Sequence, residues 1–292
     1  MNSIGKRQNP NPIFDTSIPR FKLPAGAIDC HCHIYDDFAK YPLCENPVYL
    51  PPAVKVADYL KMLDVLGVQR AVIVHANIYG LDNSLALDLM ASAPTRFRAV
   101  ALMDEAISDE EIERLHHAGV RGFRCNLVGN IGLSLEKAKI LGARVKQYGW
   151  HTQFLLDIES FPNLEEVFSG FPIDIVIDHM GRPIIDRGIN APGFQALLKF
   201  IQHDHVWVKL SAPYRTSQDH LYFKDIEPFA RALVAANSNQ LVWGTDWPHV
   251  NMDPSIPMPN DGLLCNLLAD WVPDESVREK ILVNNPERLY GF

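Results

Sequence analysis

The stretch Leu241-Val242-Trp243-Gly244-Thr245-Asp246-Trp247-Pro248-His249 begins as an apolar run and continues into polar residues. Residues 241–243 predict a short buried strand. Gly244 ends this strand, and Pro248, which has no backbone N–H to donate, prevents its continuation in a hydrogen-bonded ladder. Asp246 is therefore predicted to lie at the carboxyl end of a buried strand. The polar residues expected near it are mainly histidines.

Seven further apolar runs precede this stretch and are separated by segments with helical spacing. The runs cover residues 27–30, 70–75, 97–103, 120–126, 150–156, 173–178 and 206–210. They are rich in Val, Ile and Leu without strict alternation, as is typical of parallel strands buried on both faces. The predicted helices cover residues 53–66, 81–91, 109–117, 134–148, 164–168, 194–202, 226–236, 263–271 and 275–282.

Eight strand–helix units with short connections predict an α/β fold, a single (β/α)₈ barrel. No glycine-rich dinucleotide or phosphate-binding motif supports a doubly wound sheet instead. Residues 1–24 are polar and rich in proline, and we expect them to form an irregular arm. Residues 25–292 are expected to form one catalytic domain.

The amino-acid composition limits the kinds of partner and the cellular location that we expect for this protein. The chain has 292 residues, of which 47% are hydrophobic and 21% charged, with a formal net charge of −8. This acidic balance argues against a nucleic-acid partner but allows a small anionic substrate held by a few arginines. The N-terminal region has no apolar signal core, and no run of about 18 apolar residues predicts a membrane span. With five cysteines and no Cys-x-x-Cys pair, the expected compartment is the cytoplasm.

Polar residues follow most of the predicted strands. Because active sites of these barrels lie at the carboxyl ends of the strands, the candidates are His31, His33, Arg124, Asn126, Gln153, His179, Ser211, Tyr214, Arg215, Asp246, His249 and Asn251. Arg182 is expected to anchor its loop through Asp178 or another carboxylate. Cys32 lies between the two histidines, points away from them and is expected in the core.

Three imidazoles and a carboxylate, from His31, His33, His179 and Asp246, form the ligand set of a zinc hydrolase. They also form a workable set without metal. The carboxylate can act as general base on water, and the histidines can donate hydrogen bonds to a carbonyl oxygen as it becomes negative. The His-x-His pair alone is weak evidence, but its occurrence with the other two residues at strand ends is much stronger.

Three motifs resemble those of the amidohydrolase superfamily, in its lactone-processing branch. They are His31-Cys32-His33, His179-Met180-Gly181-Arg182-Pro183 and Gly244-Thr245-Asp246-Trp247-Pro248-His249, and the similarity extends over residues 24–292. The resemblance implies a barrel that hydrolyses a small carboxylated lactone, such as a pyrone dicarboxylate or a related muconolactone. It also implies that Asp246 activates the water and that the three histidines surround the lactone carbonyl.

By the same resemblance, Tyr49, Arg124, Arg215 and Asn251 fall where the substrate carboxylates are held. Two residues depart from the pattern: Asn130 stands in place of an arginine, and Asn77 in place of a serine. Because an arginine binds a carboxylate through two parallel hydrogen bonds, its loss points to a related lactone with a different acidic group. Together with Gln153, these residues make up the predicted substrate-binding set.

The residues leave several alternatives open. Arg124, Asn126 and Gln153 occupy strand ends where many metal-bearing relatives carry a histidine or a modified lysine, so we expect no cofactor. If a metal is present, Zn²⁺ on His31, His33, His179 and Asp246 is the alternative, in a zinc-dependent hydrolase or decarboxylase. A sugar-acid lactone isomerase and a non-enzymatic binding protein are the other rivals. The expected partner is a small anionic lactone, and a homo-oligomer is compatible with the sequence.

Overall fold

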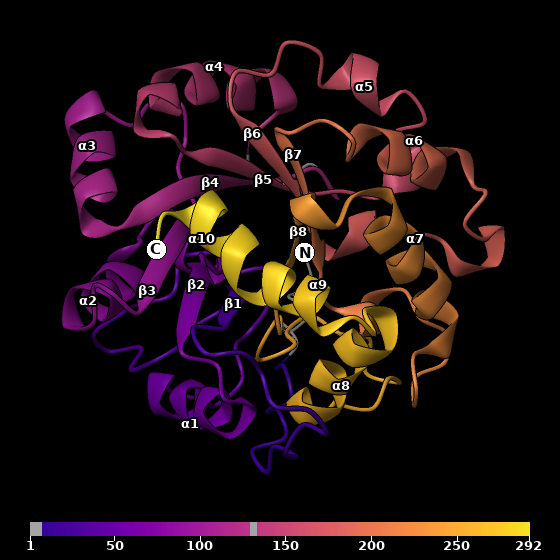
Figure 1. Cartoon of the computed structure of the whole chain (residues 1–292). Helices are drawn as coiled ribbons and strands as arrows, with labels where there is room; N and C mark the ends of the chain where they lie inside the picture. Colours follow the sequence, from indigo (N-terminus) through magenta and orange to yellow (C-terminus); the bar gives the residue numbers. More distant parts are fainter. Residues whose placement is uncertain (1–7, 129–132) are drawn as a thin grey trace, which may run out of the picture.

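Eight parallel strands form one sheet in which each strand pairs with the next along the chain. The computed structural model describes residues 8–128 and 133–292. The strands are β1 (Ile28–Cys32), β2 (Arg70–Val74), β3 (Phe97–Ala101), β4 (Val120–Asn126), β5 (His151–Leu155), β6 (Asp174–Ile177), β7 (Val206–Leu210) and β8 (Leu241–Trp243). Figure 1 shows these strands at the centre with helices around them. The predicted (β/α)₈ barrel is therefore confirmed.

The helices connect successive strands and follow the last one. They are α1 (Val56–Leu66), α2 (Ser84–Ser92), α3 (Asp109–Ala118), α4 (Leu135–Val145), α5 (Leu164–Val167), α6 (Pro192–Phe200), α7 (Glu227–Asn237), α8 (Asp261–Trp271), α9 (Glu275–Glu279) and α10 (Asn285–Tyr290). Short 3₁₀ turns cover Asn77–Tyr79, Lys146–Tyr148, Ile158–Ser160, His179–Gly181, Ile185–Arg187, Pro213–Arg215, Lys224–Ile226 and Ser238–Gln240. Serine side chains cap the first turns of α3 and α4, where the helical N–H groups lack partners.

Backbone contacts beyond the end of β8 join it to β1. The Asp246 N–H donates to the His31 carbonyl across 2.8 Å, and the His33 N–H donates to the Trp247 carbonyl across 2.7 Å. Cys32 and Trp247 form an isolated parallel bridge. The residues that bring the two edge strands of the barrel together are thus the same residues that carry the predicted catalytic side chains.

Apolar side chains from facing strands meet inside the barrel. Ile28, Cys30, Val72, Val74, Val100, Val176, Trp207 and Val242 form one buried cluster with Leu289 and Tyr290 of α10. The Asn285 side chain donates to the carbonyl of Leu241, the first residue of β8, across 2.7 Å. Arg98, near the start of β3, donates to the Gly291 carbonyl across 2.8 Å. These contacts place α10 over the amino ends of the strands.

The prediction that the last helix ends at residue 282 was wrong. A π turn over Lys280–Asn284 continues directly into α10. This wider turn places Pro286 in the first turn of α10, where its missing N–H leaves no hydrogen bond unmade. The chain therefore reaches the amino end of the barrel as helix rather than as a loop.

The segment from residue 8 to residue 24 has no helix, and its one bridge pairs Gln8 with Leu50. Asn9 is buried there and joins two loops at the carboxyl end of the barrel. Its side chain donates to the Leu50 carbonyl across 2.9 Å and accepts from the Asn251 N–H across 2.6 Å. Within the described part of the chain, no helix has both the length and the apolar content needed to cross a membrane.

Candidate active site

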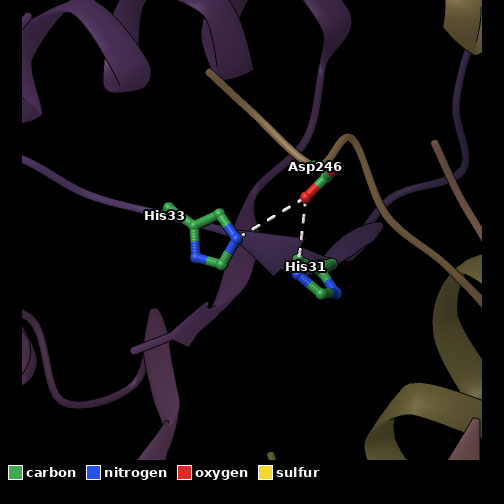
Figure 2. Close-up of side chains that lie close together, drawn as sticks. All are labelled: His31, His33 and Asp246. Carbon is green, nitrogen blue, oxygen red and sulfur yellow. Dashed lines mark ion pairs between the residues drawn. The ribbon is translucent and has the colours of Figure 1, made fainter. Parts of the chain in front are cut away.

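Four buried side chains meet at the carboxyl end of the barrel. His31 and His33 come from the end of β1, His179 follows β6, and Asp246 follows β8. Nε2 of His31 lies 3.5 Å and Nε2 of His33 lies 3.6 Å from Oδ1 of Asp246 (Figure 2). Nε2 of His179 lies 4.0 Å from the other oxygen, Oδ2. The structure brings together all four residues that the sequence predicted as catalytic.

A second carboxylate, that of Asp29, holds Asp246 opposite the histidines. Its Oδ1 accepts the N–H groups of His31 and Thr245 across 3.0 and 2.9 Å, and its Oδ2 accepts the Thr245 hydroxyl across 2.6 Å. Gly244 allows this close approach, because a Cβ there would lie 2.7 Å from Cβ of His31. Burial raises the pKa of Asp29 to about 6, although its hydrogen bonds act in the opposite direction.

Two of the catalytic side chains come from backbone that non-glycine residues rarely adopt. His179 has φ 52° and Asp246 has φ 59°, both in the left-handed region. His249 and Asn251, later in the same loop as Asp246, also have positive φ. Such conformations cluster at functional sites, where surrounding contacts hold the backbone in place. At Asp246 that support comes from the bonds of Asp29 to the preceding Thr245 and from the Asp246 N–H, which donates to the His31 carbonyl.

The two oxygens of Asp246 have different surroundings. Oδ2 accepts the Tyr214 hydroxyl across 2.6 Å and two N–H groups of Arg215 across 2.8 and 2.6 Å. Oδ1 accepts no hydrogen bond from the described residues. Burial opposes the charged form, but the charge of Arg215 outweighs it and holds the pKa of Asp246 well below its usual range. Asp246 is therefore an anion with one free oxygen aimed at the histidines.

The Nδ1 contacts of the imidazoles show which ring nitrogens can donate. Nδ1 of His33 lies 2.8 Å from the Val74 carbonyl. A carbonyl can only accept, so Nδ1 of His33 carries the hydrogen and its Nε2 carries a lone pair. Burial lowers the pKa of His31 and of His33 to about 3, so both rings are neutral at pH 7. Nδ1 of His179 lies 2.8 Å from the Ser211 hydroxyl, which can donate or accept.

Behind the imidazoles lies a buried polar group that the sequence analysis missed. Lys209 of β7 is 3.3 Å from Nδ1 of His31 and 2.6 Å from Oε1 of Gln153. Gln153 in turn donates to Asp178 across 2.9 Å. The available signal was a single charged residue within the otherwise apolar strand Val206–Leu210, which predicts a buried lysine with a specific partner.

Most of the predicted substrate-binding residues line a cavity of about 120 Å³ beside the catalytic residues. They are Tyr49, Asn77, Arg124, Arg215 and Asn251, together with His33 and His179. A larger cavity of about 390 Å³ shares Arg215 and Asn251 and extends outward. Gln153 is placed elsewhere: both ends of its amide are bonded beneath the histidines, and it does not line the cavity. Asn130 lies outside the described residues.

Two arginines present polar groups at this cavity. Arg124 donates from Nη1 to the His75 carbonyl across 3.3 Å, and its buried Nε has no protein partner in the described structure. Arg215 uses Nε and Nη2 on Asp246 and stays partly exposed. Arg182 anchors its loop by pairing with Asp157 across 3.3 Å rather than with Asp178. The first two guanidinium groups can therefore attract an acidic group on a ligand.

Tyr214 links Asp246 to a further buried pair. Its hydroxyl lies 3.1 Å from Nδ1 of His249, and Nε2 of His249 lies 3.2 Å from Oδ1 of Asp261. All four side chains are buried. The chain of contacts from Asp261 to Asp246 fixes the hydroxyl of Tyr214, which the sequence marked only as a strand-end residue.

Three site atoms also have the spacing of a metal site. One ligand atom each from His31, His33 and Asp246 lies within 4.8 Å of the others. Nε2 of His31 and Oδ1 of Asp246 are buried without hydrogen-bond partners in the described structure. Imidazole nitrogen and carboxylate oxygen are the ligands that Zn²⁺ prefers. By residue type and spacing these three residues fit a divalent ion, which would polarise a carbonyl and acidify a bound water.

Comparisons with known proteins identify the family of the chain. A family model described as Amidohydrolase matches residues 28–292. A 2-pyrone-4,6-dicarboxylate hydrolase of Comamonas testosteroni is 36% identical, over 94% of this chain and 93% of its own. A 4-sulfomuconolactone hydrolase of Hydrogenophaga intermedia is 35% identical, over 99% and 94%. A D-galactarolactone isomerase of Agrobacterium fabrum is 29% identical, over 96% and 93%. With its barrel, its histidine–aspartate site and a family match over nearly its whole length, the chain belongs to the amidohydrolase family.

Proposed function

We propose that this protein hydrolyses the ring ester of a small anionic lactone. The observation that carries the proposal is the ionised carboxylate of Asp246, whose Oδ1 lies 3.5 and 3.6 Å from two imidazoles beside a cavity lined by His33, Arg124 and Arg215. The named relatives support it, because two of them are lactone hydrolases. A 2-pyrone-4,6-dicarboxylate or a muconolactone-type lactone, with a carboxylate or sulfonate, is the proposed substrate class.

The attacking water binds between Asp246 and His33. Oδ1 of Asp246 and Nε2 of His33 both carry lone pairs, so a water can donate one hydrogen to each of them. This role for His33 differs from the expectation that all three histidines donate to the lactone carbonyl. Holding the water by both hydrogens directs an oxygen lone pair toward the substrate, which lowers the entropic part of the barrier.

In the proposed reaction, a proton moves from the water to Asp246 and then to the leaving ring oxygen. The water oxygen bonds to the carbonyl carbon while Asp246 takes the proton, and the carbonyl oxygen becomes negative. His31 and His179 stabilise that oxygen by donating from Nε2, with Ser211 donating to Nδ1 of His179. When the ring C–O bond breaks, the ring oxygen takes the proton back from Asp246. The products are a carboxylic acid and a hydroxyl group on one open chain.

Substrate binding rests on the residues that line the cavity. Arg124 lines the cavity and offers its guanidinium group to an acidic group of the lactone, and Arg215 offers the nitrogen that Asp246 does not use. Tyr49, Asn77 and Asn251 provide neutral hydrogen-bonding groups around them. A charge-assisted hydrogen bond at each acidic group fixes the carbonyl against the water.

A screen of carboxylated and sulfonated lactones, with zinc content measured on the same sample, tests the proposal. We expect turnover in ¹⁸O-labelled water to place the label in the new carboxylate. Asp246→Asn should remain folded and lose activity by at least about 10³-fold, because an amide cannot accept the proton. Near-normal turnover by this variant would refute the role of Asp246.

The same screen separates the alternatives. A retained ring, with the acyl group moved between hydroxyls and no ¹⁸O uptake, would identify an isomerase, as one relative is named. Loss of activity with a chelator, restored by zinc, would identify a metal-dependent hydrolase. Turnover of no lactone would leave a binding protein.

We also infer a cytoplasmic location, because all five cysteines are unpaired in the structure. A nucleic-acid partner is not part of the proposal, because the net charge is −8. Self-association is open to measurement by light scattering.

A further inference from the structure

Lys209 is a buried cation directly behind the catalytic imidazoles. Its side chain is fully buried, and its Nζ lies 3.5 Å from Oδ1 of Asp178, which is also fully buried. The same nitrogen lies 2.6 Å from Oε1 of Gln153 and 3.3 Å from Nδ1 of His31. The Asp178 carboxylate thus balances the ammonium, whose hydrogens are directed at Gln153 and His31. Neither Lys209 nor His31 lines the cavity, so Lys209 can influence a bound substrate through its contact with His31 and not directly.

The donor and the acceptor in the hydrogen bond between Lys209 and His31 can be assigned. An ammonium can donate hydrogen bonds and cannot accept them. Nδ1 of His31 must therefore accept, which leaves the hydrogen of the neutral ring on Nε2. Oδ1 of Asp178 is 3.3 Å from the same Nδ1 but has no hydrogen-bond partner in the described structure. The carboxylate and the ammonium lie at the same distance from Nδ1, but only the contact with Lys209 has the angles of a hydrogen bond.

We propose that Lys209 is a positioning residue that fixes His31 as the Nε2–H tautomer. In this form His31 donates to the carbonyl oxygen of the substrate and has no lone pair on Nε2 for a metal ion. His33 is fixed the other way by the Val74 carbonyl, so the two imidazoles of the His-x-His motif have opposite roles. The donor role rests on the proposed function, but the tautomer and the metal preference can be measured without any lactone.

Removal of Lys209 should move the hydrogen of the neutral His31 ring from Nε2 to Nδ1. Asp178 would then accept the hydrogen of Nδ1, as carboxylates do behind metal-bound histidines. Nε2 of His31 would carry a lone pair beside Nε2 of His33 and Oδ1 of Asp246, which already face the same point. Lys209 also lies against a second group with ligand spacing, made by His31, Asp178 and His179. A single ammonium therefore opposes a metal ion at both groups.

The tautomer is read directly by ¹⁵N NMR of the histidine-labelled protein, with His31 identified by the signal lost in His31→Gln. We expect the wild-type protein to show a protonated Nε2 on His31 and a protonated Nδ1 on His33. In Lys209→Met, the hydrogen on His31 should move to Nδ1 while His33 stays unchanged. A wild-type His31 with its hydrogen on Nδ1 would overturn the proposal.

Zinc affinity gives a second readout, from titration of each chelator-treated protein with ZnCl₂ alone. Lys209→Met should bind Zn²⁺ at least about tenfold more tightly than the wild type, in line with the effect of residues behind metal ligands. Asp178→Asn, which keeps the lysine, should show no such gain. The double variant Asp178→Asn/Lys209→Met keeps the core free of an unpaired charge. The amide oxygen introduced at residue 178 can still accept the hydrogen of Nδ1, so this variant should also gain affinity, but less than the single lysine variant.

The outcomes distinguish positioning from general loosening of the core. An equal gain in Asp178→Asn, or no gain in either lysine variant, would overturn the proposal. If circular dichroism shows that Lys209→Met does not fold, the zinc affinity of the double variant tests the proposal instead. With an active lactone, Lys209→Met should lower kcat by about 10²-fold with little change in KM, as expected for a lost carbonyl donor. Failure to find any lactone substrate would refute the proposed function and leave the tautomer and zinc results standing.

Discussion

Arg215 directs two nitrogens, Nε at 2.8 Å and Nη2 at 2.6 Å, at a single oxygen of Asp246. This oxygen, Oδ2, also accepts the hydroxyl of Tyr214. The three donors hold the carboxylate in one orientation and leave Oδ1 toward His31 and His33. The guanidinium thus serves the base directly, as well as facing the cavity where a substrate acid group would bind.

Replacing this guanidinium with an ammonium should reduce the rate more than the binding. In Arg215→Lys, one point charge cannot give two N–H groups to Oδ2, so Asp246 gains rotational freedom. We expect kcat to fall by about 10²-fold, the cost of a misplaced catalytic group. Steady-state kinetics with the active lactone provide the measurement. Arg187→Lys, at an exposed arginine, is the matched control, and an unchanged kcat in Arg215→Lys would contradict the prediction.

Arg124 should determine preference for the acidic group of the substrate. Its guanidinium group lines the cavity, and a hydrogen bond to a charged group is worth about 1.5–3 kcal/mol. Arg124→Met should therefore lower kcat/KM for the acidic lactone by about 10- to 150-fold. The methyl ester of the same lactone should react almost equally with both proteins. An equal loss for acid and ester would show that Arg124 only supports the fold.

The pH dependence of activity should lack the usual histidine transition. In the free protein the pKa of Asp246 is well below its usual range, and the pKa values of His31 and His33 are about 3. Between pH 5 and 7.5 none of these groups changes charge, so kcat/KM should be flat and fall only as the pH approaches their pKa values. A pH–rate profile measures this. A step near pH 6.5 would show that one of these histidines titrates with an ordinary pKa.

Stability, unlike activity, should change with pH in that range. Burial and the charge of Lys209 lower the pKa of His151 to about 3, from 6.5 in the unfolded chain. Below pH 6.5 the unfolded chain therefore binds a proton that the folded protein does not, and the free energy of unfolding decreases by about 1.4 kcal/mol per pH unit for each such histidine. Stability is complete above pH 6.5 and is lost as the pH falls toward 3.

The variant His151→Leu isolates one of these histidines without touching the catalytic set. Between pH 7 and 5 it should lose about 2 kcal/mol less stability than the wild type, measured by urea unfolding at both pH values. His117→Gln removes an exposed histidine and should behave like the wild type. If the pH dependence of His151→Leu equals that of the wild type, His151 has the same pKa in the folded and unfolded states, which would contradict the prediction.

The order of the elements, and the position of the four predicted catalytic residues at strand ends, could be read from the sequence because both depend on short, local signals. Buried parallel strands are continuous apolar runs, and the residue after such a run reaches the rim of the barrel. His31, His33, His179 and Asp246 all stand at such positions, which explains why the sequence identified them. Tyr49 and Asn77 were placed through the family resemblance, because loops after strands carry no comparable signal.

The depth of a side chain within the barrel could not be predicted from the sequence in this way. Gln153 was expected at the rim, but it is the third of five residues in β5 and lies beneath the histidines. Lys209 lies at a similar depth in β7 and was overlooked, because a single lysine in a sequence is usually exposed. Where a strand ends is set by its pairing with neighbouring strands, so a sequence pattern does not fix which inward side chains reach the substrate.

The first described residues and the C-terminal helix lie on opposite sides of the barrel. Asn9 is bonded to loops beside the site, whereas α10 closes the far end through Leu289 and Tyr290. A purification tag or an immobilising surface attached after Phe292 would therefore leave the entrance open to substrate. The same attachment made just before Asn9 would stand at the entrance and strain the contact that holds Leu50 to Asn251.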